Sequence, residues 1–311
     1  MNLLRASFIA AVALAAPVSA AAQHYIPHRV FDSKSKKFID FEQLAARAAS
    51  VDFVFFGEEH DNTDTHWLEF ALLQAVERRR PKATVALEMF ERDVQPLVDE
   101  YLAGRTSEDD FLKGSRPWPR YRDHYRGLVE FSRNHQWPVV ASNVPRRLAS
   151  LVSRRGLAAL DTLPDADRPF VAGERRCEGK GDYFKRFSAE MSGMASHGGA
   201  DTSAAARAAQ VLRIYEAQCL KDETMAESVA RVWAPGGLVI HYNGSFHSDY
   251  RLGTAERVRR RLPDGRSLVI SAIPVANLDS IAPTKDDRKR GDILLFVLKP
   301  PAADSTRTPT R

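Results

Sequence analysis

Short apolar runs alternate with longer stretches of helical periodicity along most of the chain. Six runs rich in β-branched and aromatic residues predict strands at 52–56, 84–90, 138–143, 238–243, 267–273 and 292–298. Apolar positions three or four residues apart predict helices at 65–79, 94–103, 125–135, 145–154 and about 203–233. This alternation is typical of an α/β fold with a mainly parallel or mixed sheet. The length of the last helix predicts a helical insertion that leaves the sheet.

The two ends of the chain differ in character from the part between them. Residues 1–22 hold one charge at Arg5, an apolar stretch at 6–16 and small residues at 18–22, which is typical of a cleaved secretory signal peptide. This segment predicts an exported, periplasmic protein, and it has no cysteine near the cleavage site to accept a lipid. We expect residues 23–299 to form a single α/β domain and the Pro/Thr/Ser-rich tail at 300–311 to be disordered. No later apolar run reaches the roughly 20 residues of a transmembrane helix.

Charge and cysteine content indicate which partners the protein can bind and whether it forms a disulfide. The net charge of +5 is modest, and arginine runs at 78–80 and 259–261 predict solvated helix faces, with a surface for a small anionic ligand as the alternative. Nucleic acid is an unsuitable partner for an exported protein of this charge. The two cysteines, Cys177 and Cys219, predict a disulfide in an oxidising compartment, and two free buried thiols are the alternative.

Polar residues follow four of the predicted strands. Residues 57–61 follow the first strand, Glu88 lies near the end of the second, Asn143 ends the third with Arg146 behind it, and residues 243–247 follow the fourth. Ligands of open parallel sheets bind beyond the carboxyl ends of the strands. The sequence therefore predicts a site at this edge of the sheet.

Two of these strand ends share the pattern Gly-x-x-His, at Gly57 to His60 and at Gly244 to His247. A glycine permits a tight turn off each strand, so both imidazoles can point at one place. The predicted metal ligands are His60, His247 and Glu58, a mixed set that suits zinc, manganese, cobalt or iron. Glu88 or Glu59 would then serve as the general base toward a metal-bound water. His66, six residues after His60, is a further candidate.

Five stretches carry a resemblance to a known family. GEEHDNTDTH, ALEMFERDVQ, ASNVPRRL, EAQCLKDETMAESVA and NGSFHSDYRLG, in this order between residues 52 and 273, resemble the ChaN-like haem-binding uptake family of the Tiki superfamily. The resemblance implies two related halves, each beginning with a strand and its Gly-x-x-His corner. It also assigns His60, His247 and Glu88 to a shared site, with Arg146 as a weaker match.

The resemblance implies two kinds of function. ChaN-like proteins are linked to haem binding and iron acquisition, with haem held by tyrosine or histidine at a dimer interface, so a homodimer is expected. Tiki relatives are metal-dependent peptidases, which leaves a metal-dependent hydrolase of peptides or esters as the alternative. The aromatic and arginine-rich segment 116–125 is either loop packing or a rim over a flat ligand. The candidate haem contacts are Tyr121, Tyr125, Tyr250, Asn143 and Arg146.

The chain departs from the family pattern in two places. Many ChaN-like proteins are lipoproteins, and the lipid-accepting cysteine is missing here. The second motif is often Gly-Asn-Gly-His in the family but Gly-Ser-Phe-His in this chain, so Phe246 places a bulky ring where a ligand plane would approach.

Overall fold

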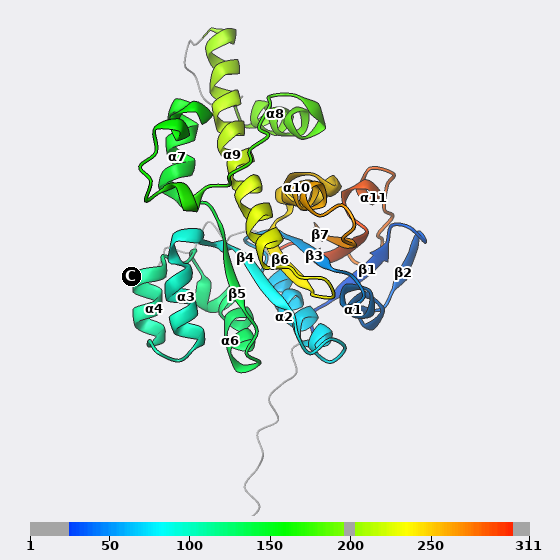
Figure 1. The fold of residues 1–311 in the computed structure, drawn as a ribbon. Helices are drawn as coiled ribbons and strands as arrows, with labels where there is room; N and C mark the ends of the chain where they lie inside the picture. The colour runs from blue at the N-terminus through cyan, green and yellow to red at the C-terminus, as the bar shows by residue number, and fades with distance from the viewer. Residues whose placement is uncertain (1–24, 196–202, 301–311) are drawn as a thin grey trace, which may run out of the picture.

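An eight-stranded mixed sheet forms the centre of the protein, which we describe from a computed structural model covering residues 25–195 and 203–300 (Figure 1). The predicted signal peptide and C-terminal tail lie outside the described residues, apart from residue 300. The strand order is β2-β1-β8-β7-β3-β6-β4-β5. The strands are β1 (His28–Asp32), β2 (Lys37–Ile39), β3 (Phe53–Glu58), β4 (Thr84–Glu91), β5 (Val139–Asn143), β6 (Val239–Gly244), β7 (Ser267–Val275) and β8 (Ile293–Leu298).

The six strands from β8 to β5 run parallel, and β1 and β2 add an antiparallel edge. All six predicted strands are confirmed within two residues at each end, and β1 and β2 were not predicted. Four of the parallel strands lie next to one another in the order β3-β6-β4-β5. These are the four strands whose ends carry the polar residues, so the predicted gathering at one edge follows from the topology.

Helices cover both faces of the sheet. They are α1 (Phe41–Ala49), α2 (Thr63–Glu77), α3 (Gln95–Leu102), α4 (Glu108–Ser115), α5 (Tyr121–His124), α6 (Arg126–Asn134), α7 (Arg146–Arg155), α8 (Gly181–Ala195), α9 (Ala204–Val232), α10 (Gly253–Arg261) and α11 (Asp287–Arg290). On one face, side chains such as Val54, Phe56 and Ile240 pack against α1, α2 and α6. On the other face, Phe53 and Phe55 pack with residues of α9 and α10. The result is an α/β fold with three layers.

Helix α9 connects the sheet to a smaller group of helices. Its C-terminal half packs on the sheet through Ala226 and Val229, and its N-terminal half extends away from the sheet between α7 and α8 (Figure 1). The predicted helical insertion is therefore present, although half of the long helix belongs to the core. The predicted disulfide is also present, and it joins Cys177 to Cys219 of α9 with an S–S distance of 2.07 Å.

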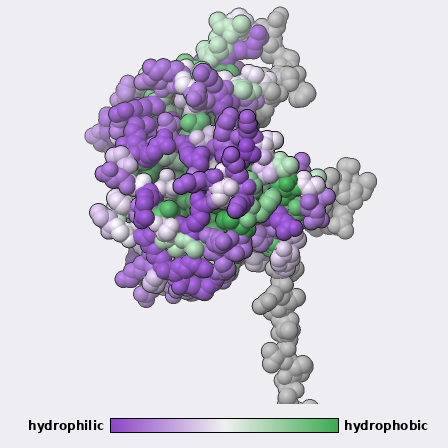
Figure 2. Space-filling model, turned by 90° about the vertical axis from the view of Figure 1, so that its right-hand side faces the viewer, coloured by the Kyte–Doolittle hydropathy of each residue, from purple (hydrophilic) through white to green (hydrophobic). Residues whose placement is uncertain are grey.

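The surface is mostly hydrophilic on the side that Figure 2 shows, with apolar residues gathered in one part of it. None of the helices in the described part of the chain is both long and apolar enough to span a membrane. The arginine runs are less solvated than predicted. Arg80 donates hydrogen bonds to the backbone carbonyls of Val51 and Gly236. In the second run, Arg260 and Arg261 form ion pairs with the buried Glu223.

Candidate functional site

The two Gly-x-x-His corners lie side by side, because β3 and β6 are neighbouring parallel strands with Glu58 paired to Gly244. Each glycine makes room for the other corner. A Cβ added at Gly244 would lie 2.9 Å from Nε2 of His60, and one added at Gly57 would lie 3.0 Å from Cα of Ser245. Glu59 links the corners as well, since its Oε1 accepts a 3.2 Å hydrogen bond from the Ser245 hydroxyl.

His60 is the exposed histidine of the pair, with 46% of its side chain open to solvent. Its Nδ1 donates a 2.7 Å hydrogen bond to Oε1 of Glu58, and its ring lies edge-on to Trp118 at 4.9 Å. Partial burial would lower the pKa of His60, but the hydrogen bond and charge of Glu58 outweigh it and raise that pKa. Because Nδ1 carries the proton in this bond, the neutral ring presents the lone pair of Nε2.

His247 has a different environment, because it is buried between two carboxylates. Its Nε2 lies 3.1 Å from Oε1 of Glu88, and its Nδ1 lies 2.8 Å from Oδ1 of Asp222. Burial opposes charge on the ring, but Glu88 and Asp222 raise the pKa of His247 to about 10. In return, His247 lowers the pKa of Glu88 to about 2 in spite of burial. Both nitrogens of His247 therefore carry protons in this arrangement, and its assignment as a metal ligand stays a prediction.

Asp222 was not identified from the sequence. It lies on α9 and accepts hydrogen bonds from the hydroxyls of Thr254 and Tyr183 as well as from His247. Gly253 lets the chain pass close to this group, because a Cβ there would lie 2.5 Å from the His247 carbonyl oxygen and 3.0 Å from Asp222. The sequence signal was a run of polar residues, DET, inside a helix that also has to pack against the sheet.

A second group of buried acids lies below His60. Glu58 at the end of β3 and Glu69 on α2 are both buried, and His66 lies between them with Nδ1 2.9 Å from Oε2 of Glu69. Burial raises the pKa of each glutamate to about 8, and the neighbouring charge adds to this effect at Glu58. Burial also lowers the pKa of His66. Glu58, His66 and Glu69 form the only group of three metal-binding side chains found among the described residues.

Helix α2 places His66 and Glu69 in this group. Asn62 caps the helix by accepting a 2.9 Å hydrogen bond from the amide of Thr65, and its own amide group donates to the carbonyl of Leu298 at the end of β8. The stretch DNTDTH therefore turns from the strand end into a helix and brings His66 back under the corner, where its Nε2 donates to the His60 carbonyl at 3.1 Å. The expectation that His66 lies near the site is consistent with this position.

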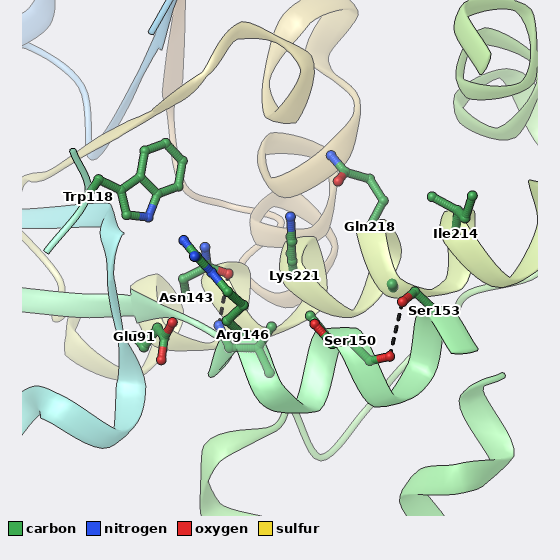
Figure 3. Close-up of a pocket in the computed structure, with 12 residues that line it drawn as sticks. Glu91, Trp118, Asn143, Arg146, Ser150, Ser153, Ile214, Gln218 and Lys221 are labelled. Carbon is green, nitrogen blue, oxygen red and sulfur yellow. Dashed lines mark hydrogen bonds between the residues drawn. The ribbon is translucent and has the colours of Figure 1, made fainter. Parts of the chain in front are cut away.

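A pocket of about 250 Å³ lies beside the corners (Figure 3). Its walls come from the end of β5, the first turns of α7, the middle of α9 and Trp118, and its lining includes Asn143, Val144, Arg146, Ile214, Ala217, Gln218 and Lys221. In Figure 3 the side chain of Arg146 extends from the start of α7 toward Trp118, and that of Lys221 extends from α9. Arg146 is exposed, and no ion pair holds its guanidinium among the described residues. The pocket therefore combines apolar walls with two cations and one acid, Glu91, whose carboxylate is paired with Arg116 at 2.9 Å.

The predicted tyrosines lie elsewhere. Tyr121 and Tyr125 are buried, at 4% and 1% exposure, and the Tyr125 hydroxyl donates to Glu58 at 2.7 Å. Burial raises the pKa of both phenols, which disfavours a phenolate. Neither phenol lines the pocket, and the assignment of Tyr121 and Tyr125 to haem stays a prediction. Tyr250 is half-buried under Arg186 and donates to Asp286, and it does not line the pocket.

Asn143 lines the pocket and also has a structural role, whereas Phe246 lies outside the pocket. Asn143 is buried and uses its amide group to bind the Glu88 carbonyl at 3.0 Å, so it orders the strand ends at the base of the pocket. The ring of Phe246 packs 5.2 Å from Tyr183 of α8 and lies under Arg186, and it does not line the pocket. The bulky residue in the second motif therefore leaves this pocket open.

Comparison with known families agrees with this geometry. The family of haem-binding uptake proteins named ChaN, within the Tiki superfamily, matches residues 44–258, more than half of the chain. The chain belongs to this family. Its match spans both Gly-x-x-His corners, Glu88, the pocket and the C-terminal half of α9.

One solved structure supports the fold, and two others align with lower scores. ChaN of Campylobacter jejuni, described as binding haem cofacially, aligns with a TM-score of 0.67 and 16% identity over 88% of this chain and 97% of its own. A protein from Bacillus cereus aligns at 0.47 with 12% identity, covering 82% of this chain and 90% of its own. The erythromycin esterase EreC aligns with a TM-score of 0.42 and 10% identity, covering 88% of this chain and 83% of its own. No curated protein matches the sequence.

Proposed function

We propose that the chain is an exported haem-binding protein that takes part in haem and iron uptake. The observation that carries this proposal is the pocket lined by Arg146 and Lys221, which combines apolar walls with two cations in a member of a haem-binding family. His60 lies next to this pocket, because its ring contacts Trp118 in the pocket wall. The periplasmic location is part of the proposal, and it rests on the signal-like sequence of residues 1–22.

The side chains around the pocket suit the chemistry of haem. Haem requires an axial ligand for its iron, an apolar surface for its ring and cations for its propionates. We assign to His60 the nitrogen that would hold the iron, through Nε2, and to Arg146 and Lys221 the cations that would meet the propionates. Trp118 and Ile214 supply apolar surface. When bound, haem supplies an iron with a coordination position that an imidazole nitrogen fills.

Glu58 prepares His60 for this role. Its carboxylate accepts a hydrogen bond from Nδ1, which fixes the tautomer and the direction of the ring. The same bond makes the lone pair of Nε2 more basic, so Nε2 is a stronger ligand for iron. Tyr125 holds the same oxygen of Glu58 in place through its hydroxyl. The buried tyrosine expected to bind haem thus supports the histidine instead.

The test is a visible-absorbance titration of residues 23–311 with haemin. We expect a saturable Soret shift with a dissociation constant of about 1 µM or tighter, equivalent to roughly 8 kcal/mol. His60→Ala should weaken binding at least about tenfold and alter the Soret maximum, because the axial ligand is lost. His135→Ala, which removes an exposed histidine on α6's C-terminal side, is the matched control. A weak, non-saturating change in the unaltered protein would rule the proposal out.

The propionate contacts have a separate test within the same assay. Arg146→Glu reverses the charge at the mouth of the pocket, whereas Arg154→Glu makes the same change two turns further along α7, outside the pocket. We expect only Arg146→Glu to weaken haemin binding. Equal effects of the two variants would mean that net charge, not a contact, drives the binding.

A second candidate function is hydrolysis of peptides or esters, which the pair of exposed His60 and buried Glu58 beside the charged His247 favours. In this function His60 takes a proton from the attacking water, and Glu58 orients the ring of His60. The test uses peptide and ester substrates with manganese, cobalt or zinc added in turn. Turnover that His60→Ala abolishes and His135→Ala retains would support hydrolysis, and the absence of turnover under all conditions would exclude it.

A further inference from the structure

The buried group of Glu58, His66 and Glu69 has an arrangement of atoms that neither haem binding nor hydrolysis explains. One ligand atom from each side chain lies within 4.8 Å of the other two, and all three side chains are buried. Nδ1 of His66 lies 2.9 Å from Oε2 of Glu69 and 3.5 Å from Oε2 of Glu58. The three side chains come from β3 and α2, so they lie on rigid elements.

The hydrogen bond on the far side of His66 fixes its tautomer. Nε2 lies 3.1 Å from the carbonyl oxygen of His60, which is only an acceptor, so Nε2 carries a proton. In the neutral ring, Nδ1 then presents a lone pair toward two carboxylates. Lone pairs of nitrogen and oxygen at these distances repel one another unless an electrophile lies between them.

The hydrogen bonds around this group do not reach every carboxylate oxygen. A proton between Nδ1 and Glu69 accounts for the 2.9 Å contact, but Oε2 of Glu58 and Oε1 of Glu69 remain without a hydrogen-bond partner among the described residues. Buried oxygens of carboxylates are costly to leave unpaired. The remaining neighbours do not help, because Tyr125 donates to the other oxygen of Glu58 and His124 stacks its ring on His66 at 4.0 Å.

We propose that Glu58, His66 and Glu69 bind a divalent transition-metal ion of the zinc, manganese or iron(II) class. Two carboxylates cancel the charge of such an ion in the interior, and one imidazole nitrogen with carboxylate oxygens is a donor set these metals accept. The ion would join the end of β3 to α2 and would fix Glu58, which in turn holds His60. This site is distinct from the pair of corner histidines and does not depend on haem binding.

The experiment measures retained metal. The protein is unfolded in urea with a chelator, refolded with or without zinc or manganese, passed through a desalting column and analysed by inductively coupled plasma mass spectrometry. We expect one ion per chain, slow removal by a chelator in the folded state because the ligands are buried, and a raised melting temperature. Glu69→Gln should weaken metal binding by roughly 100-fold or more.

Two control variants locate the ion. Glu77→Gln makes the same change at the far end of α2, and it should retain the metal. His60→Ala leaves the backbone carbonyl that binds His66 in place, and it should also retain the metal. Glu69→Gln is close to isosteric, and circular dichroism and a melting curve establish that it folds.

Three outcomes would overturn the inference: no ion retained by the unaltered protein, an ion retained equally by Glu69→Gln, or an ion lost in His60→Ala. The last result would place the metal at the exposed corner. Haemin titration of the same samples separates this inference from the proposed function. Normal haemin binding without retained metal would contradict the metal site alone, and retained metal without haemin binding would contradict haem uptake alone.

Discussion

Two histidines with the same local motif have opposite properties in this protein. His60 is exposed and leaves Nε2 available, whereas His247 is buried and both of its nitrogens face carboxylates. The difference comes from the elements that pack against each corner, because α9 supplies Asp222 beside His247 while loop residue Trp118 lies beside His60. His60 can therefore bind a ligand, and His247 acts as a fixed positive charge next to it.

The charge on His247 makes a prediction about pH. Its pKa of about 10 in the folded state lies above the value of about 6.5 in an unfolded chain, so its stabilising effect is complete below about pH 6.5 and is lost as pH rises through about 10. For Glu88, with a lowered pKa of about 2, the effect is lost as pH falls toward 2. We expect the ring resonance of His247 in NMR spectra to remain that of an imidazolium at pH 8.

Asp222→Asn provides the comparison for this measurement. It removes one of the two charges that hold the proton, so the titration midpoint of His247 should fall relative to the unaltered protein. Free energies of unfolding in urea should also fall less steeply between pH 7 and pH 10 in the variant. A midpoint near that of a free histidine in the unaltered protein would contradict the charged arrangement.

Gly244 makes a prediction about ligand binding. Its Cβ in Gly244→Ala would approach Cε1 and Nε2 of His60 to 2.8 and 2.9 Å, so the ring has to turn away from its bond with Glu58. We expect haemin affinity to fall about tenfold or more with a small change in stability. Gly173→Ala is the control, because its Cβ would have an ordinary contact of 3.6 Å. Unchanged haemin binding in Gly244→Ala would show that His60 is not the ligand.

The residues at strand ends were predictable, whereas most of those on helices, apart from Arg146 and His66, were not. His60, His247, Glu88 and Asn143 end neighbouring parallel strands, so their shared location followed from the run of strands alone. Tyr121 and Tyr125 were assigned to the ligand because an aromatic and basic loop suggested a rim, but both rings point into the core. Three residues on helices were missed: Asp222, Glu69 and Lys221. The local sequence of a helix does not determine the direction in which the helix approaches the edge of a sheet.

At the scale of elements, α9 contributes most to the site. Within two turns it places Gln218 and Lys221 in the pocket, Asp222 on His247 and Glu223 among the arginines of α10. The disulfide at Cys219 and the packing on the sheet hold this part of the helix on both sides. Helix α9, which the sequence predicted as an insertion, therefore forms one wall of the pocket and supplies the carboxylate that binds His247.

The ion pairs of Glu223 lead to a prediction about how α9 contributes to stability. It is fully buried and binds Arg257, Arg260 and Arg261 at 3.2, 2.7 and 2.6 Å. Glu223→Gln leaves the buried guanidinium of Arg257 without its charged partner, and we expect a loss of about 3–5 kcal/mol in the free energy of unfolding. Urea denaturation checks this value. Glu227→Gln, which affects a less buried pair on the same helix, should cost less; a reversed order would contradict the assignment.

Elements with a strong apolar pattern were predicted well. The six parallel strands are buried on both faces and read as continuous apolar runs, which is why their bounds were found within two residues. Strands β1 and β2 are short and partly exposed, and α8 and α10 have many polar residues and depend on α9 for their packing. Their signals lie in tertiary contacts, which the pattern along the chain does not contain.

At the scale of the whole molecule, the pocket leads to a prediction about assembly. A haem ring has two apolar faces, and in the proposed function His60, Arg146 and Lys221 of one chain would hold it. The pocket residues Arg146, Ser150, Ile214 and Lys221 are themselves partly or fully exposed, so a bound haem would present its second face outward. Covering that face with a second copy of the chain removes a large apolar area from water, which favours a homodimer.

Sedimentation velocity with and without haemin measures this directly. We expect a monomer in the absence of haemin and a dimer at one haemin per chain, with absorbance at the Soret band sedimenting with the dimer. His60→Ala should remain monomeric at haemin concentrations that saturate the unaltered protein, because the haem that joins the two copies is no longer held. A monomer at full saturation would instead mean that α7, α9 and Trp118 enclose the ligand within a single chain, and the interface would then have no role in binding.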